Sequence, residues 1–473
     1  MSRYLYGASV QGIQEFIFKT NDLKSIVGAS EIVKSLVQEF ENISGYKKGN
    51  KNILLNAAGN IKAIFDDKEI LENIVLNFPK QIMQKAYGIT ISQAVVKIKD
   101  NYTQYDIDEL EKKLKTQRNK PSIPLDSSIN IMKLAPKTAK PLINNKDEDK
   151  ATNQKINTYK TIEKDETYKE LKDISNQKNK IAVIHIDGNG LGQIVPKLGT
   201  KLSSFSTSLD NATKNAVNIA KQNKKVREII VGGDDVTVIC DANDALSFVS
   251  EFLENFENNT RQIDELKGIQ DKLTACAGIA YCNEKYPFHY AVHLAEILCG
   301  IAKKESERKA SCLMFHNIQS SNIQSWDKII QDELTILSPI KQDDDNDKKI
   351  KYKTIRCDFG PYYLDDTKQP TIQNFLNSVE AYRCEGSPSS RLRNWLSELY
   401  KSDKNSEYLL NRINQITEQS GKWNCKIMDK NLENLYPKLS NDNLIVQRDG
   451  FEKTPIYDIL QILSTTTSYQ GDR

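Results

Sequence analysis

The sequence lacks several features that would place a protein in a class at sight. No apolar run approaches membrane-spanning length, and the N-terminus does not have the charged-then-apolar pattern of a secretory signal. None of the eight cysteines has CxxC spacing with another, which argues against a zinc knuckle and a small disulfide framework. We therefore expect a cytoplasmic protein without membrane contact, in which the cysteines within apolar runs are small buried hydrophobes.

An excess of charge of either sign is also missing. The 66 lysines and arginines oppose 63 acids, so the net charge is +3 and no global basic field indicates nucleic acid. At 473 residues the chain is too long for one ordinary core, and two or three domains are expected.

What the sequence does contain is one unusual hairpin at residues 226–240. Two β-branched apolar runs flank Gly232, Gly233, Asp234 and Asp235, and paired glycines supply the positive φ that a tight turn needs. Two adjacent carboxylates repel each other, and a divalent metal would relieve the repulsion while holding a nucleotide's phosphates. A solvated surface turn is the alternative, and the tetrapeptide alone does not decide between them.

The hairpin belongs to an order of elements that occurs twice. The first copy is predicted as strand, helices, strand, strand, helix and strand at residues 3–9, 10–45 with a break near Asn21, 52–57, 61–65, 67–86 and 88–98. The second copy is predicted in the same order, with a closing helix, at residues 180–187, 203–222, 226–240, 242–258, 273–282 and 287–304. Each copy has the βαββαβ order of a ferredoxin-like domain.

The rest of the chain separates and follows the two copies. One amphipathic helix is predicted at 105–117, and the polar stretch after it is typical of a linker or mobile insertion. A charged loop at 341–351 precedes a mostly helical tail, with apolar residues at three- and four-residue spacing in 370–382, 389–401 and 407–416. The fold class is therefore α+β, with two ferredoxin-like domains and a helical C-terminal domain. The predicted divisions are 1–100, 101–179, 180–318 and 319–473.

A candidate site follows from the strand that ends at Asp187. The next residues are Gly188, Asn189 and Gly190. In the βαββαβ order the first and third strands are central and adjacent, so Asp187 is predicted to converge on Asp234 and Asp235. Three carboxylates at one sheet edge make a two-metal site for Mg²⁺ or Mn²⁺ that can hold a nucleoside triphosphate and lower the pKa of an attacking hydroxyl. The glycines let phosphates approach the backbone, and a helix cap is the alternative for Asp187.

Other residues could complete this site or a second one. Lys303 ends the helix at 287–304 and is predicted to clamp a triphosphate, with compensation of the helix dipole as the alternative. The hairpin of the first copy has Gly59 and Asn60 in place of acids, so it cannot bind metal in the same manner. The stretch Gly28–Ser30, at an expected helix start, could cradle a phosphate, although local packing of small residues is favoured.

Taken together, these motifs resemble the large polymerase/cyclase subunit of type III CRISPR effector complexes, in a compact form. GGDD on a hairpin and IDGNGLG on the preceding strand resemble that family's catalytic palm domain. ASVQGIQEFIF with LKSIVGASEIVKSL resembles the opening of its first palm, LTACAGIAYCNEKYPFHYAVHLAEILCGIAKK the end of its second palm, and SPSSRLRNWLSELY its helical C-terminal region. These segments cover most of the chain outside the linkers.

The resemblance implies two palm domains facing each other with nucleotides between them. It implies condensation of ATP into cyclic oligoadenylate second messengers for antiviral defence, with Asp187, Asp234 and Asp235 as catalytic metal ligands. In the first palm, Ser30, Gly59 and Asn60 are implied to contact a second nucleotide. Nucleotide-binding positions are further expected in the second palm at Gly188, Asn189, Gly190, Gly232, Gly233 and Lys303.

The chain departs from the family pattern in three ways. It has no His-Asp dipeptide, so the DNA-cutting phosphohydrolase domain of many members is not expected. Residues 101–180 hold no cysteine for the zinc module that often lies between the palms. Asn189 stands where the family often has a second acid, and it offers an oxygen without a charge.

Two other functions stay open on the sequence. A non-catalytic palm pair could bind nucleotide or RNA as a scaffold of a CRISPR-type complex, in line with Asn189. A GTP-using dinucleotide cyclase could use the same hairpin, because GG-acid-acid hairpins serve there as well. The expected partner is ATP, while guide-RNA effector-complex subunits, RNA and a second copy of the chain are open alternatives.

Overall fold

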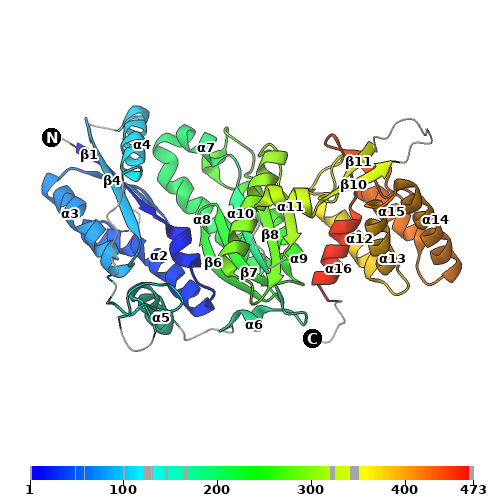
Figure 1. Cartoon of the computed structure of the whole chain (residues 1–473). Coiled ribbons are helices and arrows are strands. Elements are labelled where there is room, and N and C mark those ends of the chain that lie inside the picture. Colours follow the sequence, from blue (N-terminus) through cyan, green and yellow to red (C-terminus); the bar gives the residue numbers. More distant parts are fainter. Residues whose placement is uncertain are drawn as a thin grey trace.

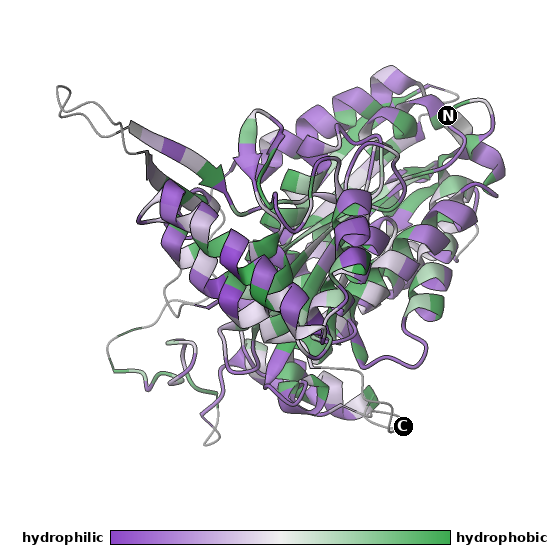
Figure 2. Ribbon diagram, turned by 90° about the vertical axis from the view of Figure 1, so that its right-hand side faces the viewer, coloured by the Kyte–Doolittle hydropathy of each residue, from purple (hydrophilic) through white to green (hydrophobic). Residues whose placement is uncertain are grey.

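The computed structural model describes residues 3–47, 50–57, 59–99, 102–120, 129, 131–143, 147–162, 168–319, 325–340 and 351–467. The first palm, the second palm and a C-terminal body follow one another along the molecule (Figure 1). Hydrophobic residues concentrate in the central strands, and the outer helices carry hydrophobic and hydrophilic residues in alternation (Figure 2). Within these residues, no helix is long and apolar enough to cross a membrane.

The first palm is a four-stranded antiparallel sheet with helices on both faces. Its strands are β1 (Arg3–Gln11), β2 (Ile53–Ala57), β3 (Asn60–Phe65) and β4 (Thr90–Ile98), in the order β2-β3-β1-β4. Its helices are α1 (Ile13–Phe18), α2 (Leu23–Ser44), α3 (Lys68–Lys85) and α4 (Gln104–Arg118). Because side chains alternate along a strand, Tyr6 stacks on Phe40 of α2, whereas Leu5 packs with Leu110 and Leu114 of α4 on the opposite face.

The second palm is a six-stranded sheet. Its strands are β5 (Lys180–Gly188), β6 (Val226–Gly232), β7 (Asp235–Asp241), β8 (Ala275–Asn283), β9 (Cys312–Asn317) and β12 (Tyr362–Tyr363), in the order β12-β9-β8-β5-β7-β6. Its helices are α7 (Leu191–Leu198), α8 (Leu202–Ala220), α9 (Ala245–Thr260) and α10 (Phe288–Glu305). Strand β8 is buried almost throughout, which explains its continuous run of small and apolar residues. The expectation of buried cysteines is confirmed for Cys240, Cys276, Cys282, Cys299, Cys312 and Cys357.

The two palms repeat one topology, so the predicted pair of ferredoxin-like units is confirmed. The order β2-β3-β1-β4 of the first palm equals the order β6-β7-β5-β8 of the second. Each hairpin also has a bulge at the same distance before its turn, at Leu54 and at Ile229. The palms touch reciprocally, since α2 packs on β6 and α8 packs on β2. In this contact the Ser30 hydroxyl donates a hydrogen bond to the Ile229 carbonyl.

Residues between the palms are more ordered than the sequence indicated. Helix α4 confirms the predicted helix, but α5 (Lys150–Ile162) occupies part of the expected linker, which makes that prediction wrong there. A Cβ at Gly28 would collide with the carbonyl of Lys155, so α5 lies directly against α2. A short helix α6 (Leu171–Ile174) then leads into β5. The buried residues of α5 are Lys155 and Tyr159, and so few buried positions explain why its sequence looks like a linker.

The C-terminal body contains the predicted helices and an additional sheet. Its helices are α12 (Ile372–Arg383), α13 (Ser389–Leu399), α14 (Asp403–Ser420), α15 (Cys425–Leu435) and α16 (Ile456–Thr465). Helix α11 (Trp326–Asp332) precedes a sheet of β10 (Thr335–Ile340), β11 (Lys351–Arg356), β14 (Phe451–Lys453) and β13 (Val446–Arg448), in that order. The sequence did not predict this sheet, because strands from opposite ends of the body form it. The predicted loop at 341–351 lies outside the described residues except for Lys351.

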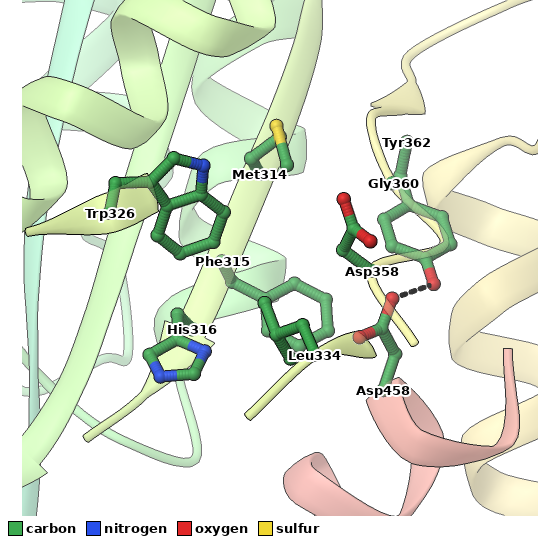
Figure 3. A pocket seen from close by; sticks show the side chains of 9 residues that line it. All are labelled: Met314, Phe315, His316, Trp326, Leu334, Asp358, Gly360, Tyr362 and Asp458. Carbon is green, nitrogen blue, oxygen red and sulfur yellow. Dashed lines mark hydrogen bonds between the residues drawn. The ribbon is translucent and has the colours of Figure 1, made fainter. Parts of the chain in front are cut away.

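A buried polar joint connects the second palm to the C-terminal body. A cavity of about 10 Å³, the space of roughly one water molecule, separates Phe315, His316 and Trp326 from Asp358 and Asp458 (Figure 3). The Tyr362 hydroxyl donates to Asp458 Oδ2 at 2.7 Å, and burial raises the pKa of Asp458 to about 7. The joint lies at the β12 edge of the sheet, away from the hairpin edge at β6.

Candidate functional site

The end of β5 brings the three predicted acids together. Strands β5 and β7 pair with Asp187 opposite Asp235, and the hairpin turn places Asp234 against Gly188. The Gly188 N–H donates to the Asp234 carbonyl at 3.1 Å, and a Cβ on residue 188 would lie 2.8 Å from Asp234 Cβ. A glycine at 188 is therefore required for the hairpin to close over the end of the strand.

Helix α8 fixes the tip of this hairpin from the side. Gly233 turns the chain with a φ of 62°, a conformation that glycine adopts without strain. The Thr213 hydroxyl donates to the Gly233 carbonyl at 2.5 Å, and Asp210 Oδ1 lies 3.4 Å from the Gly233 nitrogen. The turn is thus anchored, and it is not a free solvated loop.

The pKa values of the two hairpin carboxylates, Asp234 and Asp235, are raised by burial and by neighbouring negative charge. Burial, followed by the charge of Asp187 and a hydrogen bond to it, raises the pKa of Asp234 above its usual range. Burial, followed by the charges of Asp187, Asp234 and Glu296, raises the pKa of Asp235 to about 7. Crowded carboxylate oxygens are the ligands that Mg²⁺ and Mn²⁺ prefer.

The residues fit a divalent cation by charge and by one orphaned atom. Among the described residues, the buried Asp235 Oδ1 has no hydrogen-bond partner, although the side chain as a whole is 41% exposed. His185 Nδ1 lies 3.5 Å from this atom, but burial lowers the pKa of His185 to about 4, so the ring is neutral at neutral pH. In the described part of the chain, no three His, Cys, Asp or Glu side chains already form a metal-binding arrangement. A cation would therefore have to draw the carboxylates together.

Lys303 reaches the same point from the last turn of α10. Its Nζ donates to Asp187 Oδ2 at 2.5 Å and to the Gly188 carbonyl at 2.7 Å, and its side chain is only 12% exposed. The side chain is thus directed to the strand end and does not simply compensate the helix dipole. In this arrangement Lys303 is the counter-ion of Asp187.

Asn189 is bonded into the protein interior. Its Nδ2 donates to Thr274 Oγ1 at 2.9 Å and to the Ala310 carbonyl at 3.3 Å, and the residue is 1% exposed. Gly190 follows with a φ of 79° and begins α7. The amide nitrogen therefore holds the loop that carries the glycines, while the amide oxygen Oδ1 has no hydrogen-bond partner in the part of the chain that the structure describes.

A comparison with protein families identifies the domain that carries these acids. Residues 180–312 match the model described as "Cas10/Cmr2, second palm domain". This part of the chain is similar to the second palm domain of Cas10/Cmr2. A comparison of the chain with curated proteins found no match.

Solved structures share the fold of the chain. Csm1 of T. onnurineus aligns with a TM-score of 0.55 and 14% identity over 98% of this chain and 68% of that chain. A Csm1–Csm4 cassette in complex with cA3 aligns with a TM-score of 0.52 and 13% identity over 98% of this chain and 69% of that chain. A cassette in complex with cA4 aligns with a TM-score of 0.47 and 14% identity. That alignment spans 65% of this chain and only 54% of that chain. At these identities the likeness shows the fold.

The predicted nucleotide contacts of the first palm lie in two places, within helix α2 and at the hairpin. Helix α2 begins at Leu23, so the expected helix start at Gly28–Ser30 is wrong. Ser30 is buried and donates a hydrogen bond to the Ile229 carbonyl, in line with the packing alternative. At the hairpin, Gly59 turns with a φ of 91°. The exposed Asn60 accepts a hydrogen bond from Ser9 Oγ at 3.1 Å.

Two residues near the acids were not predicted. Glu296 of α10 contributes its charge to the raised pKa of Asp235. It lies two helical turns before Lys303, so helical periodicity could have assigned both to one face. His185 lies two residues before Asp187 on the same strand, and period-two alternation puts both on one face of the sheet.

Proposed function

We propose that the chain is a palm-type nucleotidyltransferase that condenses ATP into cyclic oligoadenylates, with Mg²⁺ or Mn²⁺ bound by Asp187, Asp234 and Asp235. The observation that carries the proposal is the register of Asp187 opposite Asp235, beside Asp234, in a domain like the second palm of Cas10/Cmr2. Csm1–Csm4 cassettes of similar fold are complexes with cA3 and with pppApApA, which supports adenine nucleotides as the substrate class.

The residues of the site have separable tasks in this reaction. A metal bound to the three carboxylates would offset the triphosphate charge and lower the pKa of the attacking ribose hydroxyl. The ribose oxygen bonds to the α-phosphorus of a second nucleotide, and the bond to pyrophosphate breaks. Gly190, where the nearest atom to an added Cβ would be 3.9 Å away, leaves room for phosphate beside the backbone. Lys303 is placed to exchange Asp187 for a phosphate oxygen once a cation neutralises that acid.

The test is incubation of the purified protein with Mg²⁺ or Mn²⁺ and each of the four ribonucleoside triphosphates, with products identified by mass spectrometry. A cyclic or oligomeric adenylate that disappears in the Asp234→Ala/Asp235→Ala variant is the expected result. A product that forms from GTP alone would instead indicate a GTP-using dinucleotide cyclase. Turnover that is unchanged in the variant would refute the proposed site.

A non-catalytic palm pair is the second candidate, as a nucleotide- or RNA-binding subunit beside a Csm4-type partner. It is favoured by Lys303, which neutralises Asp187, and by the lack of a formed three-ligand arrangement among the described residues. ATP binding without pyrophosphate release, in the presence of single-stranded RNA and of the partner subunit, would support this candidate over the enzyme.

A further inference from the structure

A single row of side chains crosses the sheet of the second palm. Strands β7, β5, β8 and β9 are neighbours, and their registers place one residue of each strand in a line: Asp235, Asp187, Cys276 and Cys312. Paired residues of neighbouring strands point to the same face of a sheet, so the two acids and the two thiols lie side by side. Lys303 of α10 meets this acid–thiol row at Asp187. The candidate metal site is therefore continuous with a pair of cysteines.

The two sulfur atoms of the acid–thiol row are in contact. Cys276 Sγ and Cys312 Sγ lie 3.6 Å apart, and both residues are fully buried. Neighbouring strands lie about 4.8 Å apart, which is within the separation of about 4.4–6.8 Å that a disulfide requires between its Cα atoms. Of the cysteines, all of which lie in the described ranges, only these two are in sulfur–sulfur contact. The backbone thus holds one pair of thiols where a bond between them can close.

The same thiols attach the acid–thiol row to its surroundings. The Cys312 thiol donates to the carbonyl of Ala302 at 3.4 Å, and Ala302 directly precedes Lys303 in the last turn of α10. Cys276 Sγ accepts a hydrogen bond from Asn189 Nδ2 at 3.4 Å, from the amide that holds the glycine loop. A disulfide has no S–H to donate and brings its sulfurs to about 2.05 Å, so both attachments change when it forms. The change reaches Lys303 through the helical turn that carries it.

We propose that Cys276 and Cys312 are a redox modification site, at which hydrogen peroxide closes a reversible disulfide that loosens the last turn of α10 and weakens nucleotide binding at the neighbouring acids. First, one sulfur attacks a peroxide oxygen, the O–O bond breaks, and a sulfenic acid and one water molecule form. The other sulfur then displaces the hydroxyl from the sulfenic sulfur, the S–S bond forms, and the hydroxyl leaves with the thiol proton as a second water molecule. Hydrogen peroxide is close to water in size, so local opening of the sheet admits it. The effect on nucleotide binding rests on the proposed function, whereas the disulfide does not.

The disulfide is tested on the full chain with Cys384→Ser as the background, because the exposed Cys384 could link two molecules. Reduced protein is treated with hydrogen peroxide, digested without reductant and analysed by peptide mass spectrometry. We expect one cross-linked peptide pair that joins Cys276 to Cys312, is lighter by two hydrogen atoms than the separate peptides, and is lost in dithiothreitol. Cys276→Ser and Cys312→Ser should each abolish it. Cys282→Ser, a buried cysteine of the same strand, is the matched control and should retain it. Absence of the cross-link in the parent protein would overturn the proposal.

The consequence is tested by binding of a non-hydrolysable ATP analogue with Mn²⁺, measured by calorimetry before and after peroxide treatment. We expect the cross-linked protein to bind about fivefold more weakly, with recovery in dithiothreitol, because Lys303 no longer lies where it meets the acids. The Cys276→Ser/Cys312→Ser variant is the control and should bind alike before and after treatment. Equal binding by the cross-linked and the reduced protein would overturn the effect on the site. A reduced protein that does not bind the analogue would refute the proposed function, while the peptide analysis would still decide on the disulfide.

Discussion

The two palms have the same strand order, the same hairpin bulge and an equivalent helix packed on the first and fourth strands, yet the side chains at the matching positions differ in charge. The second palm gathers Asp187, Asp234 and Asp235 around one lysine, and the first palm gathers Ser9 and Asn60 around one arginine. The difference shows that the topology fixes where side chains meet, while the residue types at a few registered positions decide which ligand charge is attracted. The second palm has the carboxylate donors that a cation site needs, and the matching positions of the first palm do not have them.

The largest expected effect distinguishes Asp187 in the second palm from Ser9, which occupies the matching strand position in the first palm. Asp187→Asn removes a charge that a metal needs, so we expect turnover to fall on the order of 1000-fold. Ser9→Ala removes no charge and is expected to leave Mn²⁺ binding unchanged. Product assays and Mn²⁺ titrations of both variants make the comparison. Weakened Mn²⁺ binding in Ser9→Ala would show that the first palm also contributes to metal binding, which would contradict this comparison.

The next effect concerns the glycines under the equivalent helices. Gly278→Ala places a methyl group against the α10 backbone, which cannot yield, and should lower the free energy of unfolding by about 3 kcal/mol. Gly7→Ala meets only the ends of leucine side chains, so about 1 kcal/mol is expected. Denaturant unfolding of the two variants measures both values. Gly300→Ala, in α10 with no atom near its Cβ, is a control expected to stabilise slightly.

A smaller effect is expected from removal of Lys303, the counter-ion of Asp187. Lys303→Met frees Asp187, so Mn²⁺ should bind the nucleotide-free protein about tenfold more tightly, while ATP should bind more weakly. Electron paramagnetic resonance of Mn²⁺ gives the first value and calorimetry the second. Lys304→Met, which removes the exposed neighbouring charge, is the control. Weaker Mn²⁺ binding in Lys303→Met would contradict the counter-ion role.

The smallest effect tests the joint that only the second palm makes with the C-terminal body. The pKa of Asp458 is raised to about 7, above its ordinary value of about 3.9, so the folded state retains a proton that the unfolded chain releases between these values. The free energy of unfolding should therefore fall as the pH rises from about 4 to about 7. Relative to Asp458→Asn, which does not titrate, the free energy of unfolding should decline progressively over this pH range. A pH-independent difference between the two proteins would disprove this.

Much of the fold could be predicted because period-two and helical patterns are local. The strands and helices of the βαββαβ order lie where the sequence placed them in both palms, and the convergence of Asp187 on the hairpin followed from strand order alone. The second palm also contains α7, β9 and β12, which were not predicted. The helix α5 and the C-terminal sheet were missed. Gly28 has no pattern that indicates α5 as its neighbour, and β11 and β14 are far apart in the chain.

The sequence by itself determined the repeated βαββαβ order and the acids of the second hairpin, since both are written in neighbouring residues. Only the tertiary structure decided what those acids meet. It brought Lys303 to Asp187 and Arg118 to Ser9, 116 and 109 residues away along the chain. Charges separated by such distances carry no local signal. Their pairing depends on how closely α10 and α4 pack on their sheets, and that is set by glycines and side-chain volumes in the folded core.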